Sequence, residues 1–137
     1  MTKLGNEWDN FYMQLVNTIA KQSYAPTKVG ALIVKNGNII SFSYNGTPAG
    51  WSNETKMNGK TLPCVLHAEA QAIVKVARSS ESTEGATIYC SLSPCIQCAK
   101  LIGESGIKRM VYDKTYKDLS GIAHLQHKGV QINEQNK

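Results

Sequence analysis

Apolar side chains near the beginning of the chain recur at steps of three and four residues. This spacing places them on one face of a helix, and such a face packs against a core. It predicts a helix from about Glu7 to Gln22. The residues that carry the pattern are Trp8, Phe11, Tyr12, Leu15 and Ile19.

Two runs rich in β-branched and aromatic residues come next. They span Val29–Val34 and Ile39–Tyr44, and Asn36-Gly37 between them is the pair that favours a tight hairpin turn. Asn45–Pro63 is dense in Gly, Pro, Asn, Ser and Thr, which predicts a long loop. Loops of this length inside a compact domain are usually functional.

In the second half of the chain, segments with helical periodicity alternate with segments typical of strands. A helix is predicted from Cys64 or His67 to Arg78, and a strand follows over Ala86–Leu92. The next helix has Ser93 as its cap and Pro94 as its first position, and it ends at Gly106. The last predicted elements are a strand over Ile107–Tyr112, a helix through Leu119–Gln126 and a short strand over Val130–Ile132.

The polar tail Asn133–Lys137 is expected to fray. The order α-β-β-α-β-α-β-α-β predicts an α/β fold over residues 1–137 as one domain, with an antiparallel first pair and helical crossovers later. In such sheets, sites gather at the carboxyl ends of strands and the N-termini of the following helices.

Composition narrows the classes of protein. With 42% hydrophobic and 18% charged residues, the chain is neither a disordered segment nor a fibrous repeat. It has no apolar run long enough to span a bilayer and no signal-peptide core, so we expect a cytoplasmic protein without a membrane partner. Four cysteines are then better explained as metal ligands, reactive thiols or small core residues than as disulfides. The net charge of +5 weakly favours an anionic partner, either a nucleotide or a nucleic acid.

Two short motifs carry the candidate chemistry. Cys95-x-x-Cys98 at the start of a helix places both sulfurs on one face of the first turn, which suits tetrahedral zinc. His67, at the start of another helix, can add a nitrogen. Three protein ligands leave one position for water, which is the catalytic pattern. Glu69 can reach that water without binding the metal, so the spacing matches the H-x-E…P-C-x-x-C signature of zinc nucleobase deaminases.

Other assignments of the cysteines and histidines remain open. Cys64 could complete a closed, four-ligand structural zinc site, which would make the protein a non-enzymatic binding module. We favour Cys64 as a bystander at the end of the loop. Cys90, in an apolar strand, is expected to be a buried small hydrophobic residue. His124 and His127 fit a polar helix face better than a second metal site.

At these motifs the chain resembles the cytidine deaminase-like superfamily, and more closely its deoxycytidylate (dCMP) deaminases of the short bacterial or bacteriophage type. The resemblance covers roughly residues 7–117. It runs through the segments Trp8–Met13, Thr27–Ala31, Tyr44–Ser52, His67–Ala70, Leu92–Lys100 and Gly106–Tyr112.

The resemblance implies a three-layer α-β-α fold with a mixed sheet of about five strands. It also implies that His67, Cys95 and Cys98 hold a catalytic Zn²⁺ and that Glu69 moves protons. Asn45 is similar to the family asparagine that contacts the nucleotide.

Further positions are assigned to nucleotide contacts. Tyr44-Asn45-Gly46 resembles the segment linked to allosteric triphosphate binding, although Ser43 stands where the family commonly has glycine. Lys28 and Arg109 are the basic residues that we expect near phosphates, with Lys28 at the allosteric site and Arg109 at the substrate. Tyr116 is expected to line the substrate pocket, and a surface or packing role is an equal alternative for these last three residues.

Together these features predict a zinc-dependent enzyme that converts dCMP to dUMP and ammonia and so supplies dUMP for dTMP synthesis. The resemblance further implies activation by dCTP with Mg²⁺, inhibition by dTTP, and a homo-oligomer, a hexamer in related proteins. Nucleic acid is not an expected partner. The enzymatic alternative is a deaminase that acts on tRNA or single-stranded DNA, which must bind flanking nucleotides.

Overall fold

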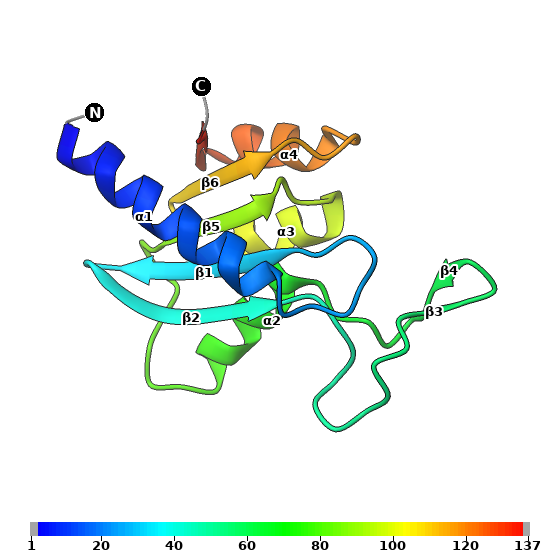
Figure 1. Ribbon diagram of the computed structural model, residues 1–137. Helices are drawn as coiled ribbons and strands as arrows, with labels where there is room; N and C mark the ends of the chain where they lie inside the picture. Colours follow the sequence, from blue (N-terminus) through cyan, green and yellow to red (C-terminus); the bar gives the residue numbers. More distant parts are fainter. Residues whose placement is uncertain (1–2, 136–137) are drawn as a thin grey trace.

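The computed structural model describes residues 3–135 and contains each of the predicted elements (Figure 1). The helices are α1 (Lys3–Ala20), α2 (Ala68–Ala77), α3 (Ile96–Glu104) and α4 (Ser120–Lys128), and the strands are β1 (Gly30–Lys35), β2 (Asn38–Tyr44), β3 (Lys56–Met57), β4 (Lys60–Thr61), β5 (Thr87–Leu92), β6 (Arg109–Lys114) and β7 (Gln131–Glu134).

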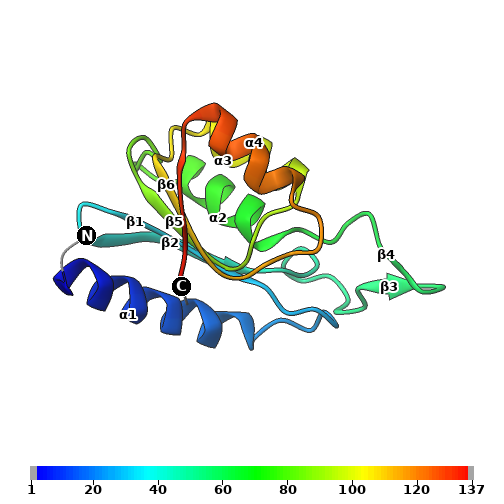
Figure 2. The same cartoon turned by 90° about the horizontal axis from the view of Figure 1, so that it is seen from above.

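Five of the strands form one mixed sheet in the order β2-β1-β5-β6-β7. β1 pairs antiparallel with β2 and β5, whereas β5, β6 and β7 are parallel neighbours. Figure 2 shows α1 on one face of this sheet and α2, α3 and α4 on the other. The expected three-layer α/β architecture with a mixed five-stranded sheet is therefore confirmed.

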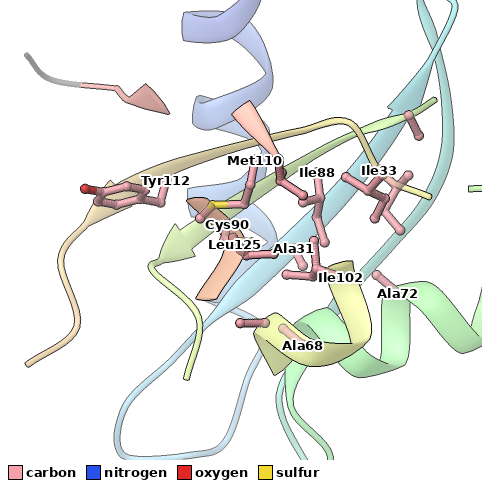
Figure 3. Packing of buried hydrophobic residues seen from close by; sticks show 14 of the residues in the cluster. Ala31, Ile33, Ala68, Ala72, Ile88, Cys90, Ile102, Met110, Tyr112 and Leu125 are labelled. Atoms are coloured by element: carbon pink, nitrogen blue, oxygen red, sulfur yellow. The ribbon is translucent and has the colours of Figure 1, made fainter. Parts of the chain in front are cut away.

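Alternation along β1 separates two cores. Ala31 and Ile33 belong to the larger cluster, which lies between the sheet and α2, α3 and α4 (Figure 3). Leu32 and Val34 point the other way, into a smaller cluster that contains Val16 of α1. Because successive side chains of a strand face opposite sides, one apolar strand serves both layers.

The first turn of α3 differs from the sequence prediction. Ser93 and Pro94 were expected to cap and open this helix, but the N-cap is Cys95 and the helix begins at Ile96. The hydroxyl of Ser93 instead accepts a hydrogen bond from the backbone N–H of Tyr116, at 2.7 Å. A tertiary contact thus occupies the side chain that the local pattern assigned to a cap.

Both ends of the chain also depart from expectation. α1 starts at Lys3 rather than at Glu7 and ends at Ala20 rather than at Gln22. β7 continues to Glu134, so the prediction of a frayed tail was wrong for its first residues. Arg109 Nε donates to Asn133 Oδ1 at 2.8 Å, and this side-chain bond helps to hold β7 against β6. Residues 136 and 137 of the expected tail lie outside the described part.

The segment predicted as a loop contains a short antiparallel hairpin. β3 and β4 pair at Lys56–Met57 and Lys60–Thr61, and Figure 1 shows this arm projecting from the body of the protein. Asn58 and Gly59 both have positive φ, which is the geometry of a tight hairpin turn. Within residues 3–135, no helix combines the length and apolar character needed to cross a membrane.

Candidate metal centre

Three side chains that could bind a metal ion converge at the N-termini of two helices. His67 is the N-cap residue of α2 and Cys95 is the N-cap residue of α3, where Cys98 follows within the first turn. One ligand atom from each of the three lies within 4.8 Å of the others. The sequence motifs thus meet in space although 28 residues separate His67 from Cys95.

The spacing of the ligand atoms fits tetrahedral zinc. His67 Nδ1 lies 3.2 Å from Cys98 Sγ and 3.6 Å from Cys95 Sγ. Bond lengths of about 2.0 Å to nitrogen and 2.3 Å to sulfur place two ligands of a tetrahedron about 3.5 Å apart. The two nitrogen-to-sulfur distances are therefore compatible with a tetrahedral zinc ion held by these three side chains.

Burial and neighbouring charges affect the ionisation of Cys98. Burial raises the pKa of this thiol far above its ordinary value, and the charges of Glu69 and Cys95 raise it further. A thiolate at Cys98 is thus unfavourable in the protein alone. A divalent cation between the sulfurs offsets both effects, because a coordinating thiol is deprotonated outright.

Glu69 is a buried carboxyl group beside these ligands. It lies in the first turn of α2 with 5% of its surface exposed. Burial raises its pKa from 4.5 to about 7, although a backbone hydrogen bond acts in the opposite direction. A carboxyl group with a pKa near neutrality can both accept and donate a proton.

A pocket opens onto the metal-binding side chains. Its volume is about 260 Å³, and it is lined by His67, Glu69, Cys95 and Tyr116 together with Thr27, Val29, Asn45, Thr61, Ala68, Leu92 and Ser93. The structure therefore brings Asn45 and Tyr116, both assigned to substrate from the sequence, to the same cavity as the metal-binding group. Thr27, Leu92 and Ser93 also line the pocket without having been predicted as site residues, although Thr27 precedes Lys28 and Leu92-Ser93 directly precede Pro94-Cys95 in the sequence.

Asn45 is fixed by backbone contacts on both sides of its amide. Its Oδ1 accepts from the N–H of Val29 at 3.0 Å, and its Nδ2 donates to the carbonyl oxygen of Thr27 at 2.8 Å. The hydroxyl of Ser23 donates to the carbonyl oxygen of Asn45 at 2.7 Å. These bonds hold the loop before β1 against the end of β2, so Asn45 shapes the pocket wall.

Arg109 lies elsewhere. Its guanidinium binds both carboxylate oxygens of Asp9, with the shorter contact at 2.5 Å, and its Nε binds Asn133. It belongs to the contact between α1 and β6 and does not line the pocket with the metal-binding group. Arg109 begins β6, whereas the pocket lies past the carboxyl end of β5 at Leu92, which explains this separation.

The residues predicted for a triphosphate site fall into two further pockets. Tyr44, Asn45 and Gly46 line one that continues over residues 47–51, and Asn45 is shared with the metal-site pocket. Ser43 has its side chain buried inside the protein and is absent from this lining.

Lys28 lines the other pocket, together with Lys21 and Lys114. Thr27 and Leu92 belong both to this lysine-lined pocket and to the metal-site pocket, so the two cavities adjoin.

The remaining candidate ligands stay outside the donor group formed among the described residues. Cys64 is half-buried and is not part of it. Cys90 is fully buried in the large core, as expected, and burial raises the pKa of its thiol well above the ordinary value. His124 and His127 lie on α4 and do not join the group either.

Comparison with known proteins shows similarity to deaminases. A family model described as the cytidine and deoxycytidylate deaminase zinc-binding region matches residues 6–114. The chain is 36% identical to the deoxycytidylate deaminase of Enterobacteria phage T2, over 76% of this chain and 78% of the phage protein.

Solved structures extend the similarity to the whole architecture. The dCMP deaminase of the cyanophage S-TIM5, crystallised with dCMP and dUMP, matches with a TM-score of 0.92 at 39% identity, over 98% of both chains. A structure from a study of tRNA:A34 deaminases matches with a TM-score of 0.57 at 25% identity, over 78% of this chain and 77% of the other.

Proposed function

This chain belongs to the family of cytidine and deoxycytidylate deaminases that share the zinc-binding region, and from that premise we propose that it hydrolyses dCMP to dUMP and ammonia. The observation that carries the proposal is the buried carboxyl group of Glu69 in one pocket with His67 and Cys95. A structural zinc site needs no such acid.

Six residues of the metal centre and its pocket are assigned a role in this reaction. His67, Cys95 and Cys98 hold the metal, which when bound supplies the Lewis acidity for attack by water at carbon 4 of cytosine. Glu69 accepts a proton from the attacking water at its carboxylate and delivers it to ring nitrogen 3. Glu69 then transfers the proton of the hydroxyl formed at carbon 4 to the amino group, and the bond from carbon 4 to this nitrogen breaks to release ammonia and leave the carbonyl of dUMP. Asn45 and Tyr116 contact the nucleotide from the pocket walls.

The phosphate of the substrate is assigned to the lysine-lined pocket. This pocket adjoins the metal-site pocket at Thr27 and Leu92 and carries Lys21, Lys28 and Lys114. Ammonium groups are common phosphate-binding groups. Lys28 also donates a hydrogen bond to the carbonyl oxygen of Ser23. In this proposal Lys28 binds the substrate phosphate rather than a regulatory nucleotide. Lys114 takes the phosphate-binding role that the sequence suggested for Arg109.

The two alternatives make different demands on the structure. A structural zinc module needs a fourth protein ligand, but Cys64 is not in the donor group. A polynucleotide deaminase needs contacts to flanking nucleotides. The three lysines would serve that role as well, so the substrate has to be tested directly.

The experiment compares dCMP, CMP, deoxycytidine and a cytosine-containing single-stranded oligonucleotide as substrates. We expect dCMP to be deaminated with the highest kcat/KM. Lys114→Gln should raise KM for dCMP and leave the weak reaction with deoxycytidine unchanged, because only dCMP carries the phosphate. A preference for the oligonucleotide would overturn the assignment, and a protein that binds zinc but deaminates nothing would favour the structural module.

Assembly and effectors complete the proposal. We propose a homo-oligomer, with a hexamer as the expected order, and regulation by dCTP with Mg²⁺ and by dTTP at the pocket lined by Tyr44, Asn45 and Gly46. The cytoplasm is the expected compartment for an enzyme that acts on free nucleotides. Size determination in solution tests the first part, and the kinetic test of regulation is described below.

A further inference from the structure

Gly121 makes an unusually close approach to the metal-binding segment. It is the second residue of α4 and is buried. A Cβ at this position would lie 3.0 Å from both the carbonyl carbon and the carbonyl oxygen of Cys95, and closer still to the carbonyl oxygen of Pro94. Real Cβ atoms essentially never come closer than 3.0 Å to such atoms. The backbone of α4 therefore rests directly on the carbonyl groups of Pro94 and Cys95.

The contacted peptide controls the position of one metal ligand. Cys95 is the N-cap residue of α3, and its carbonyl oxygen accepts the first hydrogen bond of that helix, from Ala99 at 2.9 Å. Its Sγ lies 3.6 Å from His67 Nδ1. A shift of this peptide moves the sulfur of Cys95 relative to the other donors.

The segment has little room to recoil from α4. The backbone N–H of Ser93 donates to the carbonyl oxygen of Lys114 at 2.9 Å, and its hydroxyl accepts from Tyr116 at 2.7 Å. Pro94 is fully buried. On the other side, the fully buried Leu125 anchors α4 in the large core. Because α4 and the segment Ser93–Pro94 are both held in place, a side chain added between them would displace the backbone next to Cys95.

We infer that Gly121 is a positioning residue for the metal centre and that α4 acts as its support. The missing side chain lets α4 approach closely enough to fix the backbone of Cys95, so that its sulfur is held ready for a tetrahedral ion. This inference rests on the proposed zinc site, and it gives α4 a role that its own histidines do not supply.

The test is the metal affinity of Gly121→Ala, measured by competition with a chromophoric zinc chelator. Residues that orient metal ligands typically change metal affinity by about 10- to 100-fold. We expect a loss in that range. The Co²⁺-substituted variant should also show altered thiolate-to-cobalt absorption, because those bands report on ligand geometry. Zinc affinity and a cobalt spectrum equal to those of the original protein would overturn the inference.

Two glycines provide matched controls. Gly103 lies on α3 and faces α4, but a Cβ there meets the flexible side chain of Lys128 at 3.3 Å, so Gly103→Ala should leave zinc affinity unchanged. Gly30 makes a backbone approach comparable to that of Gly121, with a Cβ 2.5 Å from the carbonyl oxygen of Val16 in α1. Gly30→Ala should lower stability without weakening zinc binding by the folded protein. Equal losses of affinity in Gly30→Ala and Gly121→Ala would assign the effect to stability alone.

A second variant covers the case in which Gly121→Ala does not fold. The carboxylate of Asp118 accepts a hydrogen bond from the N–H of Ser120 at 2.9 Å and so fixes the start of α4. Asp118→Ala should also weaken zinc binding, by less than the about 10-fold loss that is typical of a direct orienting contact. Unchanged affinity would count against support by α4. Zinc binding and deamination by the original protein are measured alongside, so the proposed function is judged separately.

Discussion

Burial determines what Glu69 can do. The carboxyl group is removed from solvent at the start of α2, and its pKa is raised to about 7 by that burial. The group is therefore suited to exchange a proton near neutral pH, whereas an exposed glutamate would remain ionised.

The first prediction concerns this carboxyl group. Glu69→Gln keeps the size of the side chain and removes its ability to move a proton. We expect zinc content to be retained and kcat to fall by about 10²- to 10⁴-fold. Metal analysis beside a turnover assay measures both quantities. Turnover near that of the original protein would contradict the assigned role.

A second residue-scale prediction separates Cys64 from the metal ligands. Cys64→Ser should keep both zinc and activity, because Cys64 lies outside the donor group. Cys98→Ser should lose the metal, since Cys98 supplies one of the three donors. Zinc content after purification and dialysis is the measurement. Loss of zinc from Cys64→Ser would indicate a closed, four-ligand site.

The sequence predicted which side chains meet at the metal centre, because motifs at helix N-termini fix their geometry, but it did not predict the position of Arg109. His67, Cys95 and Cys98 could be grouped from the sequence because helix N-termini in this sheet share one end. Arg109 carried no such constraint: a basic residue at the start of a strand gives no sign of its distant partner, which is Asp9 in α1.

At the scale of elements, one network ties α1 to the sheet. Asp9 accepts from Arg109 of β6 and from the hydroxyl of Tyr89 in β5, the latter at 2.6 Å. The Arg109 and Asp9 side chains are only 15% and 7% exposed. The network places charge beside the small core that contains Val16.

The third prediction is that Asp9→Asn destabilises the protein strongly. The variant leaves the guanidinium of Arg109 buried without its counter-charge, which typically costs about 3 kcal/mol. Urea unfolding measures the loss. As a control, Glu104→Gln removes the exposed pair with Lys128 and should give no measurable change. Equal effects of the two variants would contradict a special role for the buried network.

The fourth prediction concerns alkaline pH. Burial, together with the hydrogen bond to Asp9 and its charge, raises the pKa of Tyr89 above the ordinary value of 10.0. Its contribution to stability is therefore complete below about pH 10 and declines at higher pH, because the unfolded chain releases the phenolic proton first. The free energy of unfolding should fall less steeply above about pH 10 in Tyr89→Phe. The exposed Tyr24, changed to Phe, should leave the slope as it was.

Element boundaries show where local patterns stop being informative. The helical and strand periodicities predicted the type and order of the elements of the main sheet. The cap of α3 could not be predicted, because Ser93 is occupied by the N–H of Tyr116, a contact across the fold. The extension of β7 to Glu134 likewise reflects pairing with β6, to which the side chain of Arg109 adds a hydrogen bond to Asn133. Hydrogen bonds between distant residues decided both boundaries.

At the scale of the whole molecule, two neighbouring pockets offer a route for regulation. Asn45 lines both the metal-site pocket and the pocket bounded by Tyr44 and Gly46. Gly46 also exchanges two backbone hydrogen bonds with Leu66, at 3.1 and 2.7 Å, and Leu66 directly precedes the metal ligand His67. A ligand that moves the backbone at Gly46 would therefore also move Leu66 and the start of α2.

The last prediction is that dCTP activates and dTTP inhibits through the pocket bounded by Tyr44 and Gly46. Opposite effects require that the two nucleotides prefer different states of the enzyme, since a ligand that binds both states equally shifts nothing. A coupling of about 1 to 3 kcal/mol would change the apparent affinity for dCMP by about 5- to 150-fold. The measurement is a dCMP saturation curve alone, with dCTP and Mg²⁺, and with dTTP.

A variant in the same pocket makes this test specific. Trp51 is 61% exposed and lines the proposed effector pocket but not the metal-site pocket. Trp51→Ala should preserve the curve measured without effectors and reduce the response to both nucleotides, because an aromatic wall available for stacking is lost. Three superimposable curves for the original protein would show that this chain is unregulated. A full response in Trp51→Ala would place the effectors elsewhere, because the exposed ring is the largest side chain that the pocket offers to a base.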